Sequence, residues 1–324
     1  MIAVLGSFDG FHKGHQSLFS EACRLAEMKD SQWAIITFTP HPQLFFSSDK
    51  TKLLFTELEK NIIGKYLGVP CLIRIPFTRH VAELAPEDFL EYIHSRFKLT
   101  GIVVGDNFRF GRGRIGTIDF LRNYCVRTGI SFSCLPTISV AGITISSTTI
   151  RGLVGCGDVE KAEEFLGYPF FMTGKVVKGN SRGHNLGYPT ANLHREPYKV
   201  IPADGVYAGA VLADGQWKAA AINIGYNPTF GDIDEIRIEA HLLNFKGSLY
   251  GSMIHIIFLK KIRGELVFRS AGELEHQIED DSEKAKQAYR DAIEEIPNFF
   301  SCFSKSSAFH EIPRKTPITG LNNT

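Results

Sequence analysis

The stretch G-S-F-D-G-F-H-K-G-H, at residues 6–15, decides how the first half of the chain folds. An apolar run of strand type precedes it at residues 2–5, and apolar residues with helical spacing follow from Gln16. The decapeptide is therefore predicted to be the turn between a strand and a helix. Because a helix N-terminus has unpaired N–H groups and the positive end of the helix dipole, such a turn suits a phosphate group.

Glycines and histidines in this turn support the same interpretation. Gly6, Gly10 and Gly14 would let a ligand approach the backbone closely. His12 and His15 are three residues apart, so they share one face if the helix has begun by His12. Two imidazoles beside a backbone anion site could hold a polyphosphate. The alternative is a glycine-rich turn with two surface histidines; the F-D-G immediately before favours the phosphate.

Outward from this turn, strand-like and helix-like patterns alternate through the first half of the chain. Strand patterns occur at residues 33–38, 71–75, 102–105 and 130–135, and helical patterns at 14–29, 62–67, 86–98 and 118–127. Such alternation predicts an α/β fold with a parallel, doubly wound sheet. Its functional site is then expected at the C-terminal ends of the strands.

The pattern changes after about Tyr168. Short strand patterns separated by Gly, Pro and Asn turns occur at residues 173–178, 205–212, 216–224, 235–243 and 253–259. They predict an antiparallel barrel or sandwich. A helix at 159–165 closes the first domain, residues 167–169 form a hinge, and a helix spans 271–289. We therefore expect domains at 1–167 and 168–296, followed by a flexible tail at 297–324.

Bulk composition excludes several classes of protein. The 324 residues carry a net charge of +1, which argues against a nucleic-acid partner. The six cysteines form no C-x-x-C pair, which argues against a disulfide framework or zinc site and for a reducing compartment. No basic leader or membrane-length apolar run is evident. We expect a soluble cytoplasmic protein with no membrane partner, and composition leaves the oligomeric state open.

Two glycine-rich stretches imitate nucleotide-binding motifs. Residues 111–116 match G-x-G-x-x-G, but no Asp or Glu occurs between Cys125 and Arg151 to bind a ribose, so a dinucleotide site is rejected. That loop either places Arg112 and Arg114 beside a phosphorylated ligand or is a solvated basic turn. Residues 174–181 resemble a P-loop but have Asn180 at its lysine position, which favours a barrel loop.

A stronger signal is I-S-S-T-T-I-R at residues 145–151, where the next helix should begin. Ser147 or Thr148 is expected to cap this helix. Arg151 follows one turn later, where its guanidinium could grip a phosphate through paired hydrogen bonds.

Together, the motifs at 6–15 and 145–151 resemble those of the H-x-G-H nucleotidyltransferases, and more specifically the bacterial bifunctional riboflavin kinase/FAD synthetase family. Between them, in the family's order, lie T-F-T-P-H-P at 37–42, I-P-F-T-R-H at 75–80 and V-V-G-D-N-F-R-F-G at 103–111. G-Y-P-T-A-N-L at 187–193 and E-A-H-L-L-N-F at 239–245 are similar to the kinase module. The likeness runs from Met1 to about Tyr289.

The resemblance implies a Rossmann-like H-x-G-H nucleotidyltransferase domain and an antiparallel β-barrel riboflavin kinase domain with a C-terminal helix. In the first domain it implies transfer of AMP from ATP to FMN, which gives FAD and pyrophosphate. His12, His15 and Arg151 would be the catalytic groups, and Asn107 would bind the flavin. The remaining ATP-binding positions would be Gly6, Phe8, Gly14, Ser147 and Thr148.

For the second domain the resemblance implies phosphorylation of riboflavin by ATP. Glu239 would be the base that takes the proton of the ribityl hydroxyl. Thr190 and Asn192 would hold Mg²⁺, the implied cofactor, beside the ATP phosphates. Gly179 and Thr190 would contact ATP, and Arg263 the flavin. Without the family, P-T-A-N would indicate an ordinary turn and Glu239 an exposed strand residue.

Some positions depart from the family pattern. Ser7 stands where Asn is usual, Thr39 and Asn107 replace acids, His184 replaces a basic residue and Asn244 replaces an Asp. None removes a core group, although Asn107 and His184 could reduce affinity.

Three competing hypotheses can be compared with this one. One module alone could be active, with the other kept as a scaffold. A non-enzymatic flavin-binding regulator would bind flavin without consuming ATP. A class I aminoacyl-tRNA synthetase would need a K-M-S-K-S-type loop and a basic RNA-binding domain, and the sequence has neither.

Overall fold

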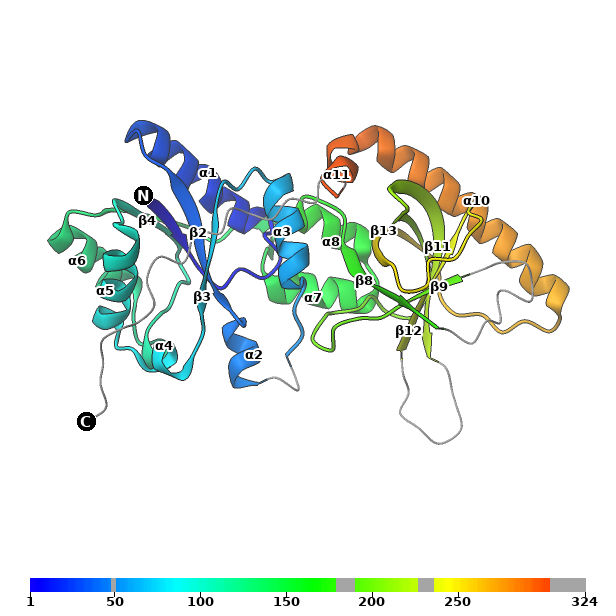
Figure 1. Ribbon diagram of the computed structural model, residues 1–324, viewed down its shortest axis with the longest axis horizontal. Coiled ribbons are helices and arrows are strands. Elements are labelled where there is room, and N and C mark those ends of the chain that lie inside the picture. Colours follow the sequence, from blue (N-terminus) through cyan, green and yellow to red (C-terminus); the bar gives the residue numbers. More distant parts are fainter. Residues whose placement is uncertain (48–50, 179–189, 227–235, 304–324) are drawn as a thin grey trace.

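The computed structural model describes residues 1–47, 51–178, 190–226 and 236–303 (Figure 1). An α/β half and a barrel half lie side by side along the long axis of the molecule. Two helices, α7 (Ser147–Cys156) and α8 (Val159–Leu166), lie between them.

The first half is built on a five-stranded parallel sheet of order β3-β2-β1-β4-β5. Its strands are β1 (Ile2–Leu5), β2 (Trp33–Thr39), β3 (Leu72–Pro76), β4 (Gly101–Gly105) and β5 (Ser131–Leu135). The order reverses beside β1, and open sheets of this kind have their crevice at the C-terminal ends of the strands around such a reversal. The predicted doubly wound sheet is confirmed.

Helices cover both faces of this sheet, which explains why β1 is fully buried. Ile2 and Val4 pack into one core with α1 (Lys13–Met28), whereas Ala3 and Leu5 pack into another with α5 (Pro86–Phe97) and α6 (Ile118–Thr128). The other elements of this half are α2 (Pro42–Phe46), α3 (Glu57–Tyr66), α4 (Arg79–Glu83), the short 3-10 helix Arg112–Arg114 and the pair β6 (Ser139–Val140) and β7 (Ile143–Thr144).

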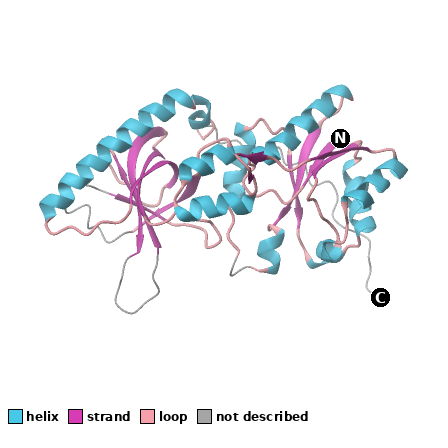
Figure 2. Cartoon of the chain, turned by 180° about the vertical axis from the view of Figure 1, so that it is seen from behind, coloured by secondary structure: helices cyan, strands magenta, loops and turns pink. Residues whose placement is uncertain are grey.

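The second half is a closed antiparallel barrel of order β10-β11-β12-β9-β8-β13, which decides between the barrel and the sandwich. Its strands are β8 (Phe171–Val177), β9 (Thr190–Leu193), β10 (Gly205–Ala213), β11 (Gln216–Tyr226), β12 (Ile236–Leu242) and β13 (Met253–Arg263). Asp214 and Gly215 join β10 to β11 with φ of 49° and 75°, as a two-residue Asp-Gly hairpin turn requires. The long helix α10 (Ala271–Glu295) lies along the outside of the barrel (Figure 2).

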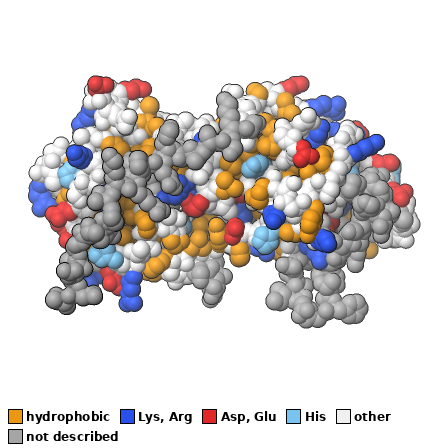
Figure 3. All heavy atoms as spheres, in the orientation of Figure 1, with side chains coloured by type: hydrophobic (Ala, Val, Ile, Leu, Met, Phe, Trp, Pro, Cys, Tyr) orange, Lys and Arg blue, Asp and Glu red, His pale blue; other side chains and the backbone are white. Residues whose placement is uncertain are grey.

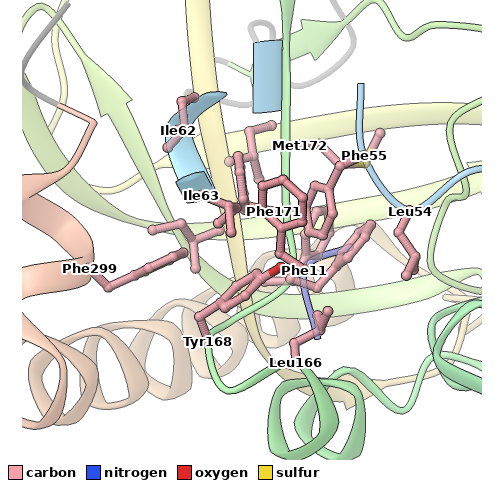
Figure 4. Packing of buried hydrophobic residues seen from close by; sticks show 14 of the residues in the cluster. Phe11, Leu54, Phe55, Ile62, Ile63, Leu166, Tyr168, Phe171, Met172 and Phe299 are labelled. Carbon is pink, nitrogen blue, oxygen red and sulfur yellow. The ribbon is translucent and has the colours of Figure 1, made fainter. Parts of the chain in front are cut away.

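The junction between the halves is a packed core, where the sequence predicted a hinge at residues 167–169. Tyr168 is 1% exposed, and its hydroxyl donates to the carbonyl of Gly10 at 2.6 Å. Phe11 and Phe55 of the first half belong to the same cluster as Phe171 of the barrel (Figure 4). A buried aromatic ring anchors this connection, so it does not have the free rotation that a hinge needs.

A buried ion pair reinforces the junction. Residues 53–55 run beside residues 198–200, with the amide of Leu53 donating to the carbonyl of Tyr198 at 2.7 Å. The ammonium of Lys199 donates to Glu59 Oε2 at 2.8 Å and to the carbonyl of Phe171 at 3.0 Å. Side-chain exposure is 2% for Lys199 and 0% for Glu59. We call residues 53–55 the interdomain segment.

The start of the expected tail also packs into this junction. Pro297–Ser301 forms α11, and Phe299, Phe300 and Phe303 are all buried. Phe299 stacks on Tyr168 with ring centroids 5.9 Å apart. Aromatic packing therefore orders residues 297–303, although the Pro, Asn and Ser residues around the phenylalanines indicated a flexible tail. Residues 304–324 lie outside the described residues.

Candidate functional site

A cleft of about 1300 Å³ opens at the C-terminal edge of the parallel sheet. It is lined from the ends of β1, β2, β4 and β5, the turn after β1, and the start of α7. Nine of the residues predicted from sequence lie in its lining: Gly6, Phe8, His12, Gly14, His15, Asn107, Ser147, Thr148 and Arg151. The fold thus brings together three segments whose residues lie up to 145 positions apart, from Gly6 to Arg151.

The two histidines form a stacked pair at the N-terminus of α1. Their ring centroids are 3.6 Å apart, and Nδ1 of each ring is buried without a hydrogen-bond partner. Burial lowers the pKa of His12 to about 4 and, together with the neighbouring His12, lowers the pKa of His15 well below its usual value. Both rings are therefore neutral at pH 7. Because buried polar atoms normally have partners, these nitrogens are suited to a ligand.

The N-terminus of α1 is also open to a ligand. Its N-cap residue is His12, whose side chain makes no capping hydrogen bond. The first N–H groups of the helix therefore lack a side-chain acceptor, which is the arrangement that binds phosphates.

The glycines of the turn make room for the protein's own side chains, where the sequence suggested room for a ligand. A Cβ at Gly6 would lie 2.7 Å from the ring of Phe8, and one at Gly10 would lie 2.5 Å from Leu54. Gly10 also has a φ of +90°. The rings of Phe8 and His15 pack edge to face, with their centroids 5.0 Å apart. The ring of Phe8 thus supports the histidine pair from within the core.

Ser146 caps α7, where the sequence suggested Ser147 or Thr148. Its Oγ accepts from the amide of Thr149 at 3.1 Å. This leaves Ser147 to donate to the carbonyl of Asp9 at 2.7 Å, and Thr148 Oγ1 to accept from Arg151 Nη2 at 2.9 Å. Four successive hydroxyl residues, at 146–149, gave the sequence no means of choosing the capping residue among them.

Aromatic side chains and arginines line the cleft away from the histidines. Phe46 and Phe77 lie edge to face with centroids 5.8 Å apart, and Phe46 is 67% exposed. Asn107 and Arg114 line the cleft on the loop after β4, whereas the side chain of Arg112 is not part of the lining. Phe77 lies in the motif at 75–80, but neither phenylalanine was predicted as a site residue, since aromatic residues in apolar runs predict a core.

The residues predicted for the second activity lie on adjacent barrel strands. Glu239 of β12 pairs directly with Asn192 of β9, and Thr190 is two residues from Asn192 on the same strand. All three side chains therefore project from one face of the sheet. Their neighbours Ala191, Ile238 and Ala240 are buried on the other face, so this face is the outer one.

Three further residues named from the sequence have a different outcome. Arg263 already has a partner, because its Nε and Nη2 donate to Asp281 of α10 at 3.0 and 2.9 Å. This ion pair ties β13 to α10, and contact of Arg263 with a flavin stays a prediction. Gly179 and His184 lie outside the described residues.

Comparison with known proteins decides the family. A family model of FAD synthetase matches residues 1–149, and one of riboflavin kinase matches residues 166–289. The bifunctional riboflavin kinase/FMN adenylyltransferase of Escherichia coli K12 is 34% identical over 297 residues, which covers 89% of this chain and 92% of the relative. The chain belongs to the bifunctional riboflavin kinase/FMN adenylyltransferase family.

Other relatives agree with this placement. The enzyme of the same name from Bacillus subtilis is 34% identical over 288 residues, covering 88% of this chain and 91% of the relative. A crystal structure described as a macrolide-efflux protein from Streptococcus pneumoniae superimposes with a TM-score of 0.80 at 33% identity, over 88% of this chain and 93% of that one. Across the described residues, none of the helices is long and apolar enough to cross a membrane.

As a riboflavin kinase/FMN adenylyltransferase, the chain phosphorylates riboflavin with ATP and then adenylylates the FMN to FAD. The expected antiparallel barrel, Rossmann-like domain and C-terminal helix are confirmed. Lys and Arg side chains are interspersed with Asp and Glu side chains on the face of the molecule in Figure 3.

Proposed function

We propose that the cleft at the sheet edge carries out adenylyl transfer and that the outer face of β9 and β12 carries out riboflavin phosphorylation. The observation that carries the first assignment is the buried, stacked pair of His12 and His15 with its two unpartnered Nδ1 atoms beside an uncapped helix N-terminus. The register of Glu239 with Asn192 supports the second assignment.

In adenylyl transfer, a phosphate oxygen of FMN attacks the α-phosphorus of ATP, and the bond from that phosphorus to the bridging oxygen of pyrophosphate breaks. The FMN phosphate is already ionised at pH 7, so the step needs no general base. It needs alignment of the two phosphates and stabilisation of charge on the leaving pyrophosphate. His12, His15 and the N–H groups of α1 supply uncharged donors, and Arg151 supplies a positive charge.

The flavin end of this cleft uses different chemistry. The planar isoalloxazine ring stacks on aromatic side chains, and Phe46, Phe77 and Phe108 are among the phenylalanines that line the cleft. Asn107 lies on the same loop as Phe108 and offers an amide for the polar edge of the ring.

In the kinase reaction, the ribityl hydroxyl of riboflavin attacks the γ-phosphorus of ATP and must lose its proton. Glu239 is the carboxylate that accepts it. The Thr190 hydroxyl and Asn192 amide oxygen fit Mg²⁺, which prefers oxygen ligands and combines few protein groups with substrate phosphates. Within the described ranges, no group of three His, Cys, Asp or Glu is placed to hold a metal, so these two residues would need those phosphates as additional ligands. When bound, Mg²⁺ neutralises charge on the transferring phosphoryl group.

We also propose a reducing, cytoplasmic location. It is supported by the six cysteines, all of which are free thiols.

Two variants test these roles, each with the other activity as its internal control. The purified enzyme is incubated with riboflavin, ATP and Mg²⁺, and the flavins are separated over time. Glu239→Gln should abolish FMN formation and still convert supplied FMN to FAD. His15→Ala should accumulate FMN without FAD.

The outcomes separate the possible errors. Loss of both activities in Glu239→Gln would place its role outside the kinase, and normal FAD formation by His15→Ala would reject the phosphate role of the histidines. Addition of EDTA should stop both reactions, and FMN formation in its presence would reject the metal site at Thr190 and Asn192.

A further inference from the structure

Asp9 is a buried carboxylate at the floor of the adenylyl-transfer cleft. It lies in the turn between β1 and α1, lines the cleft and is 4% exposed. An acid in this position is unexpected beside bound phosphates, because its charge repels them. Its presence therefore needs an explanation other than direct contact with ATP.

The carboxylate is already occupied by donors from two other segments. Oδ1 accepts from the amides of Leu54 at 2.8 Å and Phe55 at 3.4 Å. Oδ2 accepts from the amide of Leu54 at 3.0 Å and from Arg151 Nη1 at 2.8 Å. With both oxygens engaged and hidden from solvent, Asp9 is suited neither to hold a metal nor to take a proton from a substrate.

These contacts determine where the guanidinium of Arg151 lies. Nη1 is held by Asp9, and Nη2 is held by Thr148 Oγ1 at 2.9 Å. The side chain of Arg151 is 19% exposed, and its remaining N–H groups are available to the cleft. A free arginine loses considerable rotamer freedom when it binds a ligand, and an arginine that is already fixed avoids this cost.

The carboxylate is itself held in place by the junction between the halves. Leu54 and Phe55 belong to the interdomain segment, and the neighbouring Leu53 bonds to Tyr198 on the barrel side. The backbone donors that fix Asp9 are therefore rigid, and this rigidity passes to Arg151.

We propose that Asp9 is the positioning residue that orients Arg151 for adenylyl transfer. This inference rests on the phosphate role proposed above for Arg151. An alternative is that Asp9 only offsets the charge of Arg151. In that case, neutralising Asp9 would speed the reaction of the anionic substrates or leave its rate unchanged.

The test is a double-mutant cycle of Asp9→Asn and Arg151→Lys, with FAD formation from FMN and ATP as the readout. Asp9→Asn keeps the size of the side chain, but its NH₂ group must face either Arg151 or the amide of Leu54. Both of these are donors, so one of the two contacts made by Asp9 is lost. We expect kcat to fall on the order of 10- to 100-fold, the usual cost of misplacing a catalytic group. In the Arg151→Lys background the same change should alter kcat by less than about threefold.

The kinase activity and thermal melting of each variant report on folding. FMN formation should stay within about twofold of the wild type, because the barrel face is remote from Asp9. Asp9→Ser removes the same contact with a smaller side chain and should give the same split between the two activities. Glu59→Gln is the matched control. It weakens the buried ion pair with Lys199 but leaves in place the amide donors to Asp9 and the contacts of Arg151, so it should lower the melting temperature while FAD formation by the folded enzyme is retained.

The outcomes are separable. Equal losses from Asp9→Asn in both backgrounds, or a faster reaction in the single variant, would overturn the positioning role. If FMN and FAD formation fell in parallel in Asp9→Asn and Asp9→Ser, and equally in Glu59→Gln, Asp9 would be a purely structural residue. That result would also overturn the positioning role. Unchanged FAD formation in Arg151→Lys would instead reject the proposed function of Arg151.

Discussion

Replacing Lys199 by Met should strongly destabilise the whole enzyme. Lys199 is the buried cation of the junction, and its ammonium donates to Glu59 and to the carbonyls of Leu54 and Phe171. Methionine fills a similar volume but donates nothing. The substitution leaves the Glu59 carboxylate buried without its cation and leaves two buried carbonyls without a donor.

The size of the effect follows from these contacts. Removing one partner of a buried ion pair costs about 3–5 kcal/mol. Glu59 keeps two donors, the amides of Thr56 and Thr173, both at 2.7 Å, which places the expected loss toward the lower end of that range. For a chain of 324 residues, an unfolding entropy of about 2.1 cal/mol/K per residue converts 3–5 kcal/mol into a melting temperature lower by about 4–7 °C.

Urea unfolding followed by tryptophan fluorescence measures this loss. The chain has two tryptophans, Trp33 in β2 and Trp217 in β11, so single-tryptophan variants report on each half. Because one core spans the junction, both probes should shift together in Lys199→Met.

Lys52→Met is the matched control, since Lys52 donates only one bond across the same junction, to the carbonyl of Pro197 at 2.6 Å, from an exposed position. It should cost less than about 1 kcal/mol. A loss below 1 kcal/mol in Lys199→Met, or equal losses in the two variants, would refute the reasoning.

Further expectations concern the last helix and two buried groups. Phe299→Ala should lower the free energy of unfolding by about 3–5 kcal/mol, whereas an unpacked tail would show no change in the same urea experiment. Burial lowers the pKa of His255 to about 4, so the unfolded chain binds an extra proton between about pH 4 and 6.5, and this residue's share of stability is lost as the pH falls through that window. His255→Gln should therefore flatten the pH dependence by up to about 1.4 kcal/mol per pH unit, and an unchanged slope would contradict the buried neutral ring. Burial and the nearby Glu295 raise the pKa of Glu163 to about 7, so Glu163 gives the opposite slope, and Glu163→Gln should steepen the loss of stability on acidification.

Sequence patterns predicted those helices and strands whose own residues show the spacing of apolar side chains that is typical of the element. The helix predicted at 14–29 is Lys13–Met28, and the strand predicted at 33–38 is Trp33–Thr39. Strand β9 was missed without the family because it is only four residues long and its central Ala191 and Asn192 have little strand preference. Its extended form comes from pairing with β8 and β12.

The candidate site divides in the same way. His12, His15 and Arg151 stand in short motifs, so their grouping in one cleft could be expected from residue types and spacing. The partners of Asp9 could not, because two of them are backbone amides and an amide has no residue-specific signal. The burial of Phe299 was equally hidden, since it depends on Tyr168, which is far away in the sequence.

The aromatic junction has a consequence for the chain while it is being made. Tyr66 leaves the ribosome about 230 residues ahead of Phe299, which at 5–20 residues per second is roughly 10–50 s. During that interval Tyr66, and later Tyr168 and Phe171, lack the ring of Phe299 that packs against each of them in the finished enzyme. The nascent first half, more than the finished enzyme, is therefore the species most exposed to aggregation, and emergence of the helix that carries Phe299 is the event that closes its surface.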